Sequence, residues 1–165
     1  MRNLFKMLCV LIMAGGVSTA IAATSQTTFA VTASVINSCS MGTVSTLTFG
    51  TYDPTGGASA SGTTTITVTC TLLTSYNIGL NAGTTVGGTV AQRQMQGATP
   101  ANKLNYNLYT TGSHSTVWGN TIGTNTVAAA GLGLPVNHTV HGLISAGTSA
   151  NVDTYSDTIT VTLTY

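Results

Sequence analysis

The sequence contains very little charge. Lys, Arg, Asp and Glu together account for 4% of its 165 residues, whereas an ordinary globular protein has about 25%. Glutamate is absent, so the only side-chain carboxylates belong to three Asp. A nucleic-acid-binding surface requires many Lys and Arg, and nucleic acid is therefore not an expected partner. Acid–base catalysis usually relies on paired carboxylates or a tuned His, for which three scattered Asp give little support.

Long apolar runs are missing beyond the N-terminus, so no later segment predicts a membrane-spanning helix. The first residues instead have the pattern of a secretory signal peptide. Arg2 and Lys6 give a positive start, residues 8–13 are apolar, and residues 20–22 form an A-x-A cleavage motif. We therefore predict a signal peptide over residues 1–22 and secretion through the periplasm. The mature chain keeps two basic residues and three Asp, a net charge of about −1.

Cysteine is equally scarce. Of three cysteines, Cys9 lies in the predicted signal peptide, which leaves Cys39 and Cys70. A single pair in an oxidising compartment predicts a disulfide. A zinc site or a nucleophilic thiol would need Cys or His partners at suitable spacing, and the sequence offers none. The bridge would close a loop of about 30 residues and stabilise the fold by roughly 3–4 kcal/mol.

The sequence is rich in Thr, Ser, Asn and Gly, which favour strands and turns over helices. Residues 27–37 alternate apolar and polar side chains with the period of a β-strand. The apolar members of this strand are Phe29, Val31, Ala33 and Val35. Its apolar face must be buried, either in its own domain or in a neighbouring one, and the function depends on which.

Similar alternation predicts more short strands, separated by turn-forming residues. They cover residues 63–70, 75–81, 104–109, 136–144 and 155–165, with a shorter apolar face over residues 47–51. In the last strand, one face carries Ile159, Val161, Leu163 and Tyr165. Residues 56–62, 82–97 and 121–134 are rich in Gly, Ser or Thr and read mainly as loops. About seven strands of this kind predict an all-β, antiparallel β-sandwich in a single domain.

Neither a metal site nor a catalytic centre is expected. His114, His138 and His141 lack the helical H-x-x-x-H spacing, and His138 and His141 are placed on opposite faces of one strand. Asp53 precedes Pro54 and is most simply a turn residue. Nucleophile-elbow and phosphate-binding glycine motifs are absent. We expect no enzyme activity and no cofactor. The aromatic residues leave open a second reading, a secreted carbohydrate-binding module on a closed sandwich.

The sequence resembles the spore coat protein U domain family, whose members are pilin-like subunits of archaic chaperone–usher pili in Gram-negative bacteria. The landmarks run in order through nearly the whole predicted mature chain. They are the alternating strand into Cys39, Phe49-Gly50, Tyr52-Asp53-Pro54, Cys70, Arg93 with Met95, Leu104 with Tyr106 and Tyr109, Trp118-Gly119, His141-Gly142 with Ile144, Tyr155-x-Asp157-Thr158, and Tyr165. Asp153 departs from the pattern, because the family often has Gly there.

The resemblance implies an incomplete immunoglobulin-like antiparallel β-sandwich that a donor strand from another subunit completes. By this resemblance, residues 23–38 are the donor segment and residues 39–165 the pilin-like domain. The donor side chains would be Phe29, Val31, Ala33 and Val35. The edge of the acceptor groove would be formed by Ile159, Val161, Leu163 and Tyr165.

The function implied is that of a structural subunit of a cell-surface pilus, serving surface adhesion and biofilm formation. The implied partners are a periplasmic pilus chaperone, an outer-membrane usher and neighbouring pilin subunits, in a homo- or hetero-polymer. A spore-coat structural protein with the same fold is the further alternative.

Overall fold

The structure is a computed structural model that describes residues 21–165. The predicted signal peptide therefore lies, apart from its last two residues, outside the described part of the chain. Residues 21–38 contain neither helix nor strand, and all are exposed. The folded body, Val35–Tyr165, forms a compact unit of its own. Within the described residues, no helix is long and apolar enough to cross a membrane.

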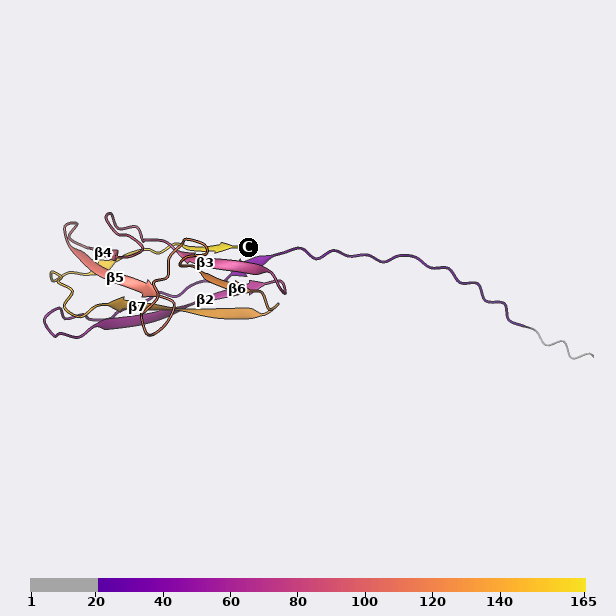
Figure 1. Ribbon diagram of the computed structural model, residues 1–165, viewed down its shortest axis with the longest axis horizontal. Coiled ribbons are helices and arrows are strands. Elements are labelled where there is room, and N and C mark those ends of the chain that lie inside the picture. The colour runs from indigo at the N-terminus through magenta and orange to yellow at the C-terminus, as the bar shows by residue number, and fades with distance from the viewer. Residues whose placement is uncertain (1–20) are drawn as a thin grey trace, which may run out of the picture. The chain divides into compact units, whose positions relative to one another are not determined.

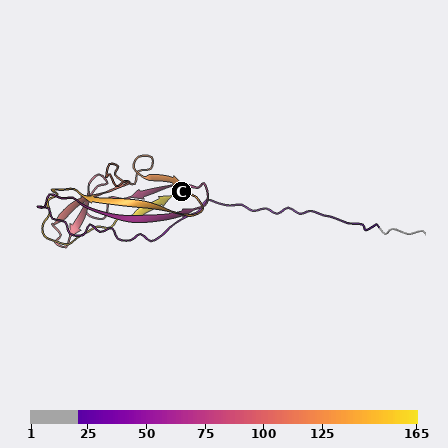
Figure 2. The ribbon, with the colours of Figure 1, turned by 90° about the horizontal axis from the view of Figure 1, so that it is seen from below.

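The body is built from two antiparallel sheets, as the sequence predicted. Their strands are β1 (Cys39–Met41), β2 (Ala60–Cys70), β3 (Ser75–Leu80), β4 (Arg93–Gly97), β5 (Lys103–Tyr109), β6 (Val127–Ala130), β7 (Pro135–Ile144), β8 (Tyr155–Ser156) and β9 (Val161–Thr164). One sheet has the order β1-β2-β7-β5-β4-β8 and the other the order β6-β3-β9. Figures 1 and 2 show the two longest strands, β2 and β7, side by side, and Figure 1 places the C-terminus beside β3.

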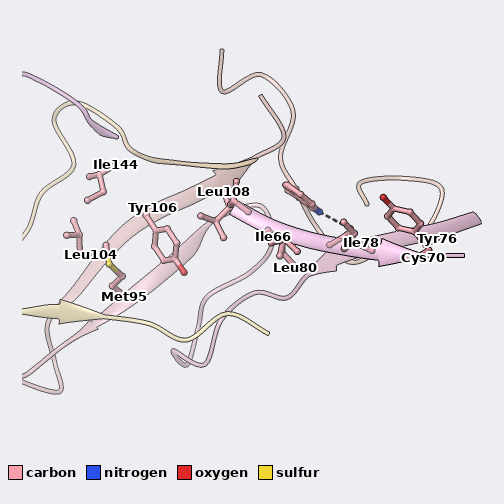
Figure 3. Packing of buried hydrophobic residues seen from close by; sticks show 13 residues of the cluster. Ile66, Cys70, Tyr76, Ile78, Leu80, Met95, Leu104, Tyr106, Leu108 and Ile144 are labelled. Atoms are coloured by element: carbon pink, nitrogen blue, oxygen red, sulfur yellow. Dashed lines mark hydrogen bonds between the residues drawn. The ribbon is translucent and has the colours of Figure 1, made fainter. Parts of the chain in front are cut away.

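Inward-facing side chains of both sheets form one apolar core. The predicted alternation is confirmed in β2, where Ile66, Val68 and Cys70 are buried and the intervening Thr are not. Figure 3 shows the core as an elongated cluster. Met95 and Leu104 lie at one end of it and Cys70 at the other. The core is therefore spread along the length of the sandwich.

The disulfide joins the start of the folded body to β2. Cys39 and Cys70 are directly opposite each other in the β1–β2 pair, with their Cα atoms 4.1 Å apart. The predicted pairing is confirmed. The bridge fixes the point at which the exposed N-terminal segment leaves the body.

Several strand boundaries differ from the predicted ones. Residues 47–51 form no strand, and neither do residues 27–37. The last residues of the predicted loop over residues 56–62 belong to β2, which begins at Ala60. Residues 155–165 divide into β8 and β9. A strand is defined by its backbone partners, which a side-chain pattern does not reveal.

Two further strands, β4 and β6, lie in segments that the sequence read as loops. In β4 the buried positions include a charged residue, Arg93, so the apolar alternation is broken. In β6 three of the four residues are Ala, which are too small to give a clear pattern.

A pair of glycines on β2 and β7 makes room for the segment that precedes β2. Gly62 and Gly142 are opposite each other in the ladder. A Cβ on Gly62 would collide with the carbonyl oxygen of Thr48, and one on Gly142 would lie 2.9 Å from the ring of Phe49. The two glycines therefore let residues 47–49 lie directly on the inner face of the sheet.

We predict that Gly62→Ala destabilises the fold by roughly 1–3 kcal/mol, because a backbone carbonyl must move to accommodate the methyl group. The matched control is Gly42→Ala, where the new Cβ would meet atoms only at an ordinary 3.7 Å. Guanidinium unfolding of both variants checks the prediction. Equal losses for the two variants would contradict this packing account.

Candidate functional site

A groove of about 890 Å³ runs into the core of the body. Its floor is made of apolar side chains from both sheets. Floor residues are Ile66, Leu80, Met95, Leu104, Tyr106, Leu108, Val140 and Ile144. One wall is the segment 44–52 and the other is the segment 150–161. Figure 3 shows that the labelled floor residues occupy the part of the core away from Cys70.

Both walls have backbone groups without a strand partner. β9 lies last in its sheet and pairs only with β3 among the strands that the structure describes. In the opposite wall, residues 43–52 make no backbone–backbone hydrogen bond to any other described residue. Half-buried peptide groups normally find hydrogen-bond partners, and an unpaired strand edge is a template for another strand. The groove therefore has the chemistry of a slot for one extended chain.

Apolar side chains line the slot on both sides. Leu47 and Phe49 are half-buried in the first wall, and the Phe49 ring packs edge-on against Tyr106 with centroids 5.9 Å apart. Ile159 and Val161, two of the predicted groove-edge residues, line the second wall. The other two predicted edge residues do not line the groove. Leu163 packs against the core, and Tyr165 is 59% exposed at the end of the chain.

The predicted donor residues lie on the exposed N-terminal segment. Phe29, Val31 and Val35 are 86%, 83% and 88% exposed, and Ala33 is exposed as well. So much exposed apolar area on one face of an alternating segment is unusual, because such side chains gain free energy when they are buried.

The second wall is fixed to the body by the carboxylate of Asp157. Its Oδ2 accepts a 2.7 Å hydrogen bond from the Tyr106 hydroxyl, and its Oδ1 accepts the backbone N–H groups of Thr84 (2.8 Å), Thr85 (3.3 Å) and Thr158 (2.8 Å). Gly83 makes this approach possible, since its φ is +91° and a Cβ there would collide with the carboxylate. Asp157 thus ties the wall to the floor and to a neighbouring loop.

Beneath this contact lies Arg93, which is fully buried. Its guanidinium donates to the carbonyl oxygens of Asn81 (2.8 Å), Leu80 (3.0 Å) and Trp118 (2.8 Å) and to Asn107 Oδ1 (2.7 Å). Burial lowers the pKa of Arg93, while Tyr106 and Asp157 act in the opposite direction. Burial also raises the pKa of Tyr106, reinforced by its hydrogen bond to Asp157, so Tyr106 stays a neutral donor.

Comparison with known proteins agrees with this architecture. Residues 25–162 match the Spore Coat Protein U domain. The chain is also 39% identical over 160 residues to Protein U of Myxococcus xanthus, covering 90% of this chain and 89% of that protein. The chain belongs to the spore coat protein U domain family.

A solved structure shares the fold of this spore coat protein U domain. It is the pre-assembly complex of a chaperone and a tip adhesion subunit, CsuC–CsuE, from archaic chaperone–usher Csu pili of Acinetobacter baumannii. The TM-score is 0.55 at 19% identity, over 79% of this chain. The match spans only 40% of the length of the other chain, so the likeness concerns the fold alone.

The other carboxylates of the domain lie in separate local networks. Asp53 accepts from the hydroxyl and N–H of Thr55, and these contacts lower its pKa. Asp153 accepts from the Thr99 N–H and the Asn102 amide, which lower its pKa to about 2. Asp153, the position that departs from the expected family pattern, thus ties the wall to the β4–β5 turn.

The histidines do not form a metal site. His138 shares a 2.9 Å hydrogen bond with Tyr76, and burial lowers its pKa. His141 lies instead beside His114, with ring centroids 6.4 Å apart. Across residues 21–165, no group of three or more His, Cys, Asp or Glu is placed to hold a metal ion.

Sequence reasoning missed the connected set of Arg93, Tyr106 and Asp157. The first two were noted as family landmarks and the third as part of a Tyr-x-Asp motif, and no contact among the three was predicted. A usable signal was present, because Arg93 is one of only two basic residues in the predicted mature chain. A buried guanidinium must find several acceptors.

We predict that Tyr106→Phe lowers the free energy of unfolding by roughly 1.5–3 kcal/mol, because the hydrogen bond to the charged, half-buried carboxylate of Asp157 is lost. Tyr155→Phe is the matched control, since its hydroxyl donates to the exposed carbonyl of Asn151 at 2.8 Å. That control should lose about 0.5 kcal/mol. The two variants are compared by guanidinium unfolding. A Tyr106→Phe loss no larger than the control's would argue against the tie between floor and wall.

Proposed function

We propose that this protein is a structural subunit of a chaperone–usher pilus that polymerises by donor-strand complementation. Residues 27–35 of one copy occupy the groove of the next subunit. The observation that carries the proposal is the groove itself, with an apolar floor and unpaired backbone on both walls. One inserted strand satisfies both walls at once, which is the arrangement called β-augmentation.

The donor residues fit the chemistry of the groove. Their alternation places Phe29, Val31, Ala33 and Val35 on one face, and that face would meet the apolar floor. Burying one Phe and two Val, at about 1.5–3 kcal/mol each, contributes roughly 5–9 kcal/mol. That is comparable with the whole stability of an ordinary domain. Ladder hydrogen bonds to both walls add to it, so the joint between subunits resists separation.

The proposal assigns a role to each part of the chain. Residues 1–22 direct secretion and are removed, residues 23–38 are the donor segment, and residues 39–165 are the acceptor domain. Ile159 and Val161 form the working part of the groove edge. Leu163 and Tyr165 extend that edge toward the C-terminus, where a chaperone can pair with the free side of β9.

The partners follow from the exposed groove. An open apolar slot with an unpaired strand promotes aggregation unless it is covered. We infer that a periplasmic chaperone covers it first, that an outer-membrane usher releases the subunit, and that neighbouring pilins replace the chaperone. One solved structure of this fold contains a pilus subunit in a pre-assembly complex with its chaperone, which corresponds to the first of these steps. The pilus would lie on the cell surface and serve adhesion and biofilm formation.

A catalytic role is not part of the proposal. The three Asp of the body lie in three separate hydrogen-bond networks, each with its own structural partners. At the groove, the Tyr106 hydroxyl and the Asp157 carboxylate are engaged with each other. The site is suited to holding an extended chain.

Phe29→Ala should weaken the joints of the polymer by roughly 1.5–3 kcal/mol while leaving secretion intact. The matched control is Thr28→Ala, which changes the neighbouring side chain on the other face of the donor strand and should have little effect. Polymers collected from cells are heated in detergent, and the temperature at which they dissociate is measured. Loss of the folded Phe29→Ala subunit from the periplasm, or unchanged polymer stability, would count against the donor assignment.

A further inference from the structure

A second, smaller cavity shares one lining residue, Tyr106, with the floor of the groove. Its volume is about 260 Å³, and residues of β5, β7 and the neighbouring loops line it. Val140 and Ile144 of β7 point into the core, and Leu143 points the other way because side chains alternate along a strand. The same alternation on β5 turns Asn105 and Tyr109 outward. Asn105, Tyr109 and Leu143 therefore line the cavity from the outer face of the six-stranded sheet.

The lining of this cavity is polar and carries no charge. The side chains that matter here are Gln92, Asn105, Asn107, Tyr109, Leu143 and Ser145. No Lys, Arg, Asp or Glu contributes to it. An anion or a cation would find no partner in such a site, so the fitting ligand is neutral and rich in hydrogen-bonding groups.

One of the polar side chains already uses its hydrogen-bonding groups within the protein. Asn107 accepts from Arg93 Nη1 (2.7 Å) and from the N–H of Leu108 (2.9 Å), and it donates to the carbonyl oxygen of Ala91 (2.7 Å). Its amide has little left to offer a ligand. Asn107 therefore shapes the cavity and is not available to bind.

Other groups are held in place with free hydrogen-bonding capacity. Asn105 Oδ1 accepts a 3.0 Å hydrogen bond from Gln94, which orients the amide and leaves Asn105 Nδ2 free to donate. Within residues 21–165, the Asn105 Nδ2, the Tyr109 hydroxyl and the Ser145 hydroxyl have no hydrogen-bond partner. The Tyr109 ring is itself fixed, edge-on to His114 with centroids 5.2 Å apart. Oriented donors beside a fixed aromatic ring are a ready-made recognition surface.

We propose that this cavity binds one ring of a neutral saccharide. A pyranose has hydroxyl groups around its edge for Asn105, Tyr109 and Ser145, and C–H bonds on its faces that pack against Tyr109 and Leu143. The volume is below the ~300–1,000 Å³ typical of drug-sized sites, so a single sugar unit fits better than an extended chain. The proposal does not depend on the groove, because Tyr106 is the one residue that lines both sites and it is not among the saccharide contacts.

Saturation-transfer NMR tests the proposal on the full-length protein as purified, whether monomeric or polymeric. The probes are the methyl glycosides of glucose, galactose, mannose and N-acetylglucosamine. We expect saturable binding of at least one of them, with a Kd near 1 mM, the range in which a small ligand gains only a few kcal/mol. Asn105→Ala should weaken that binding at least tenfold, and Tyr109→Phe, which keeps the ring, severalfold.

Asn137→Ala is the matched control. It removes an amide from the same outer face, and that amide also accepts one hydrogen bond, from the Thr67 hydroxyl at 2.8 Å. Its affinity should equal that of the unmodified protein. The unfolding midpoint of each variant shows that the fold is retained. The proposal is overturned if none of the four glycosides binds saturably, or if Asn105→Ala and Tyr109→Phe bind as well as the control.

Discussion

Unpaired peptide groups on either side of an apolar groove are the constraint around which this domain is arranged. A sandwich can satisfy its backbone only by pairing every strand edge that it buries. Among the described residues, the first wall makes no backbone–backbone hydrogen bond, and β9 in the second wall is paired on one side only. Contacts on both sides of the groove hold those segments in place. The paired glycines Gly62 and Gly142 allow the first wall to pack closely against the sheet. A hydrogen bond between Asp157 and Tyr106 fixes the second wall to the groove floor. The gap between them is therefore a built feature of the fold.

The scarcity of charge makes the few charged residues easy to interpret. Arg93 is buried where four carbonyl oxygens and an amide oxygen converge, and it fixes the ends of several elements in one place. Asp157 and Asp153 perform the same task at the surface, each collecting N–H groups from a loop distant in sequence. Because Arg93, Asp153 and Asp157 form hydrogen bonds within the domain, contacts with other molecules fall to the neutral Thr- and Asn-rich surface.

Much of the fold could be predicted from the sequence, because β2, β3, β5 and β7 alternate clearly and bury the side chains that the pattern selects. The disulfide followed from the compartment and the cysteine count. The rest depends on information that a side-chain pattern lacks. β4 buries an Arg, β6 is mostly Ala, and the first wall has the composition of a strand without a partner.

The groove was foreseen only through the family resemblance. Two of the predicted edge residues, Ile159 and Val161, line the groove, whereas Leu163 and Tyr165 lie outside its lining. Their role as the edge that receives a donor strand stays a prediction. Alternation alone cannot tell which part of a strand faces the core of its own domain and which part faces an open slot. The connection between Tyr106 and Asp157 was beyond reach, because it joins residues far apart in the sequence.

The central claim is that the groove accepts the N-terminal segment of another copy. The most direct measurement attaches a second copy of residues 24–37 to Tyr165 through a flexible linker and compares this protein with the unmodified one. Light scattering gives the mass of each, and calorimetry gives the unfolding temperature. The account predicts that the added strand converts a polymerising or aggregating protein into a monomer that unfolds at a higher temperature. A native chain that is already a stable monomer, and whose unfolding the added strand does not change, would contradict it.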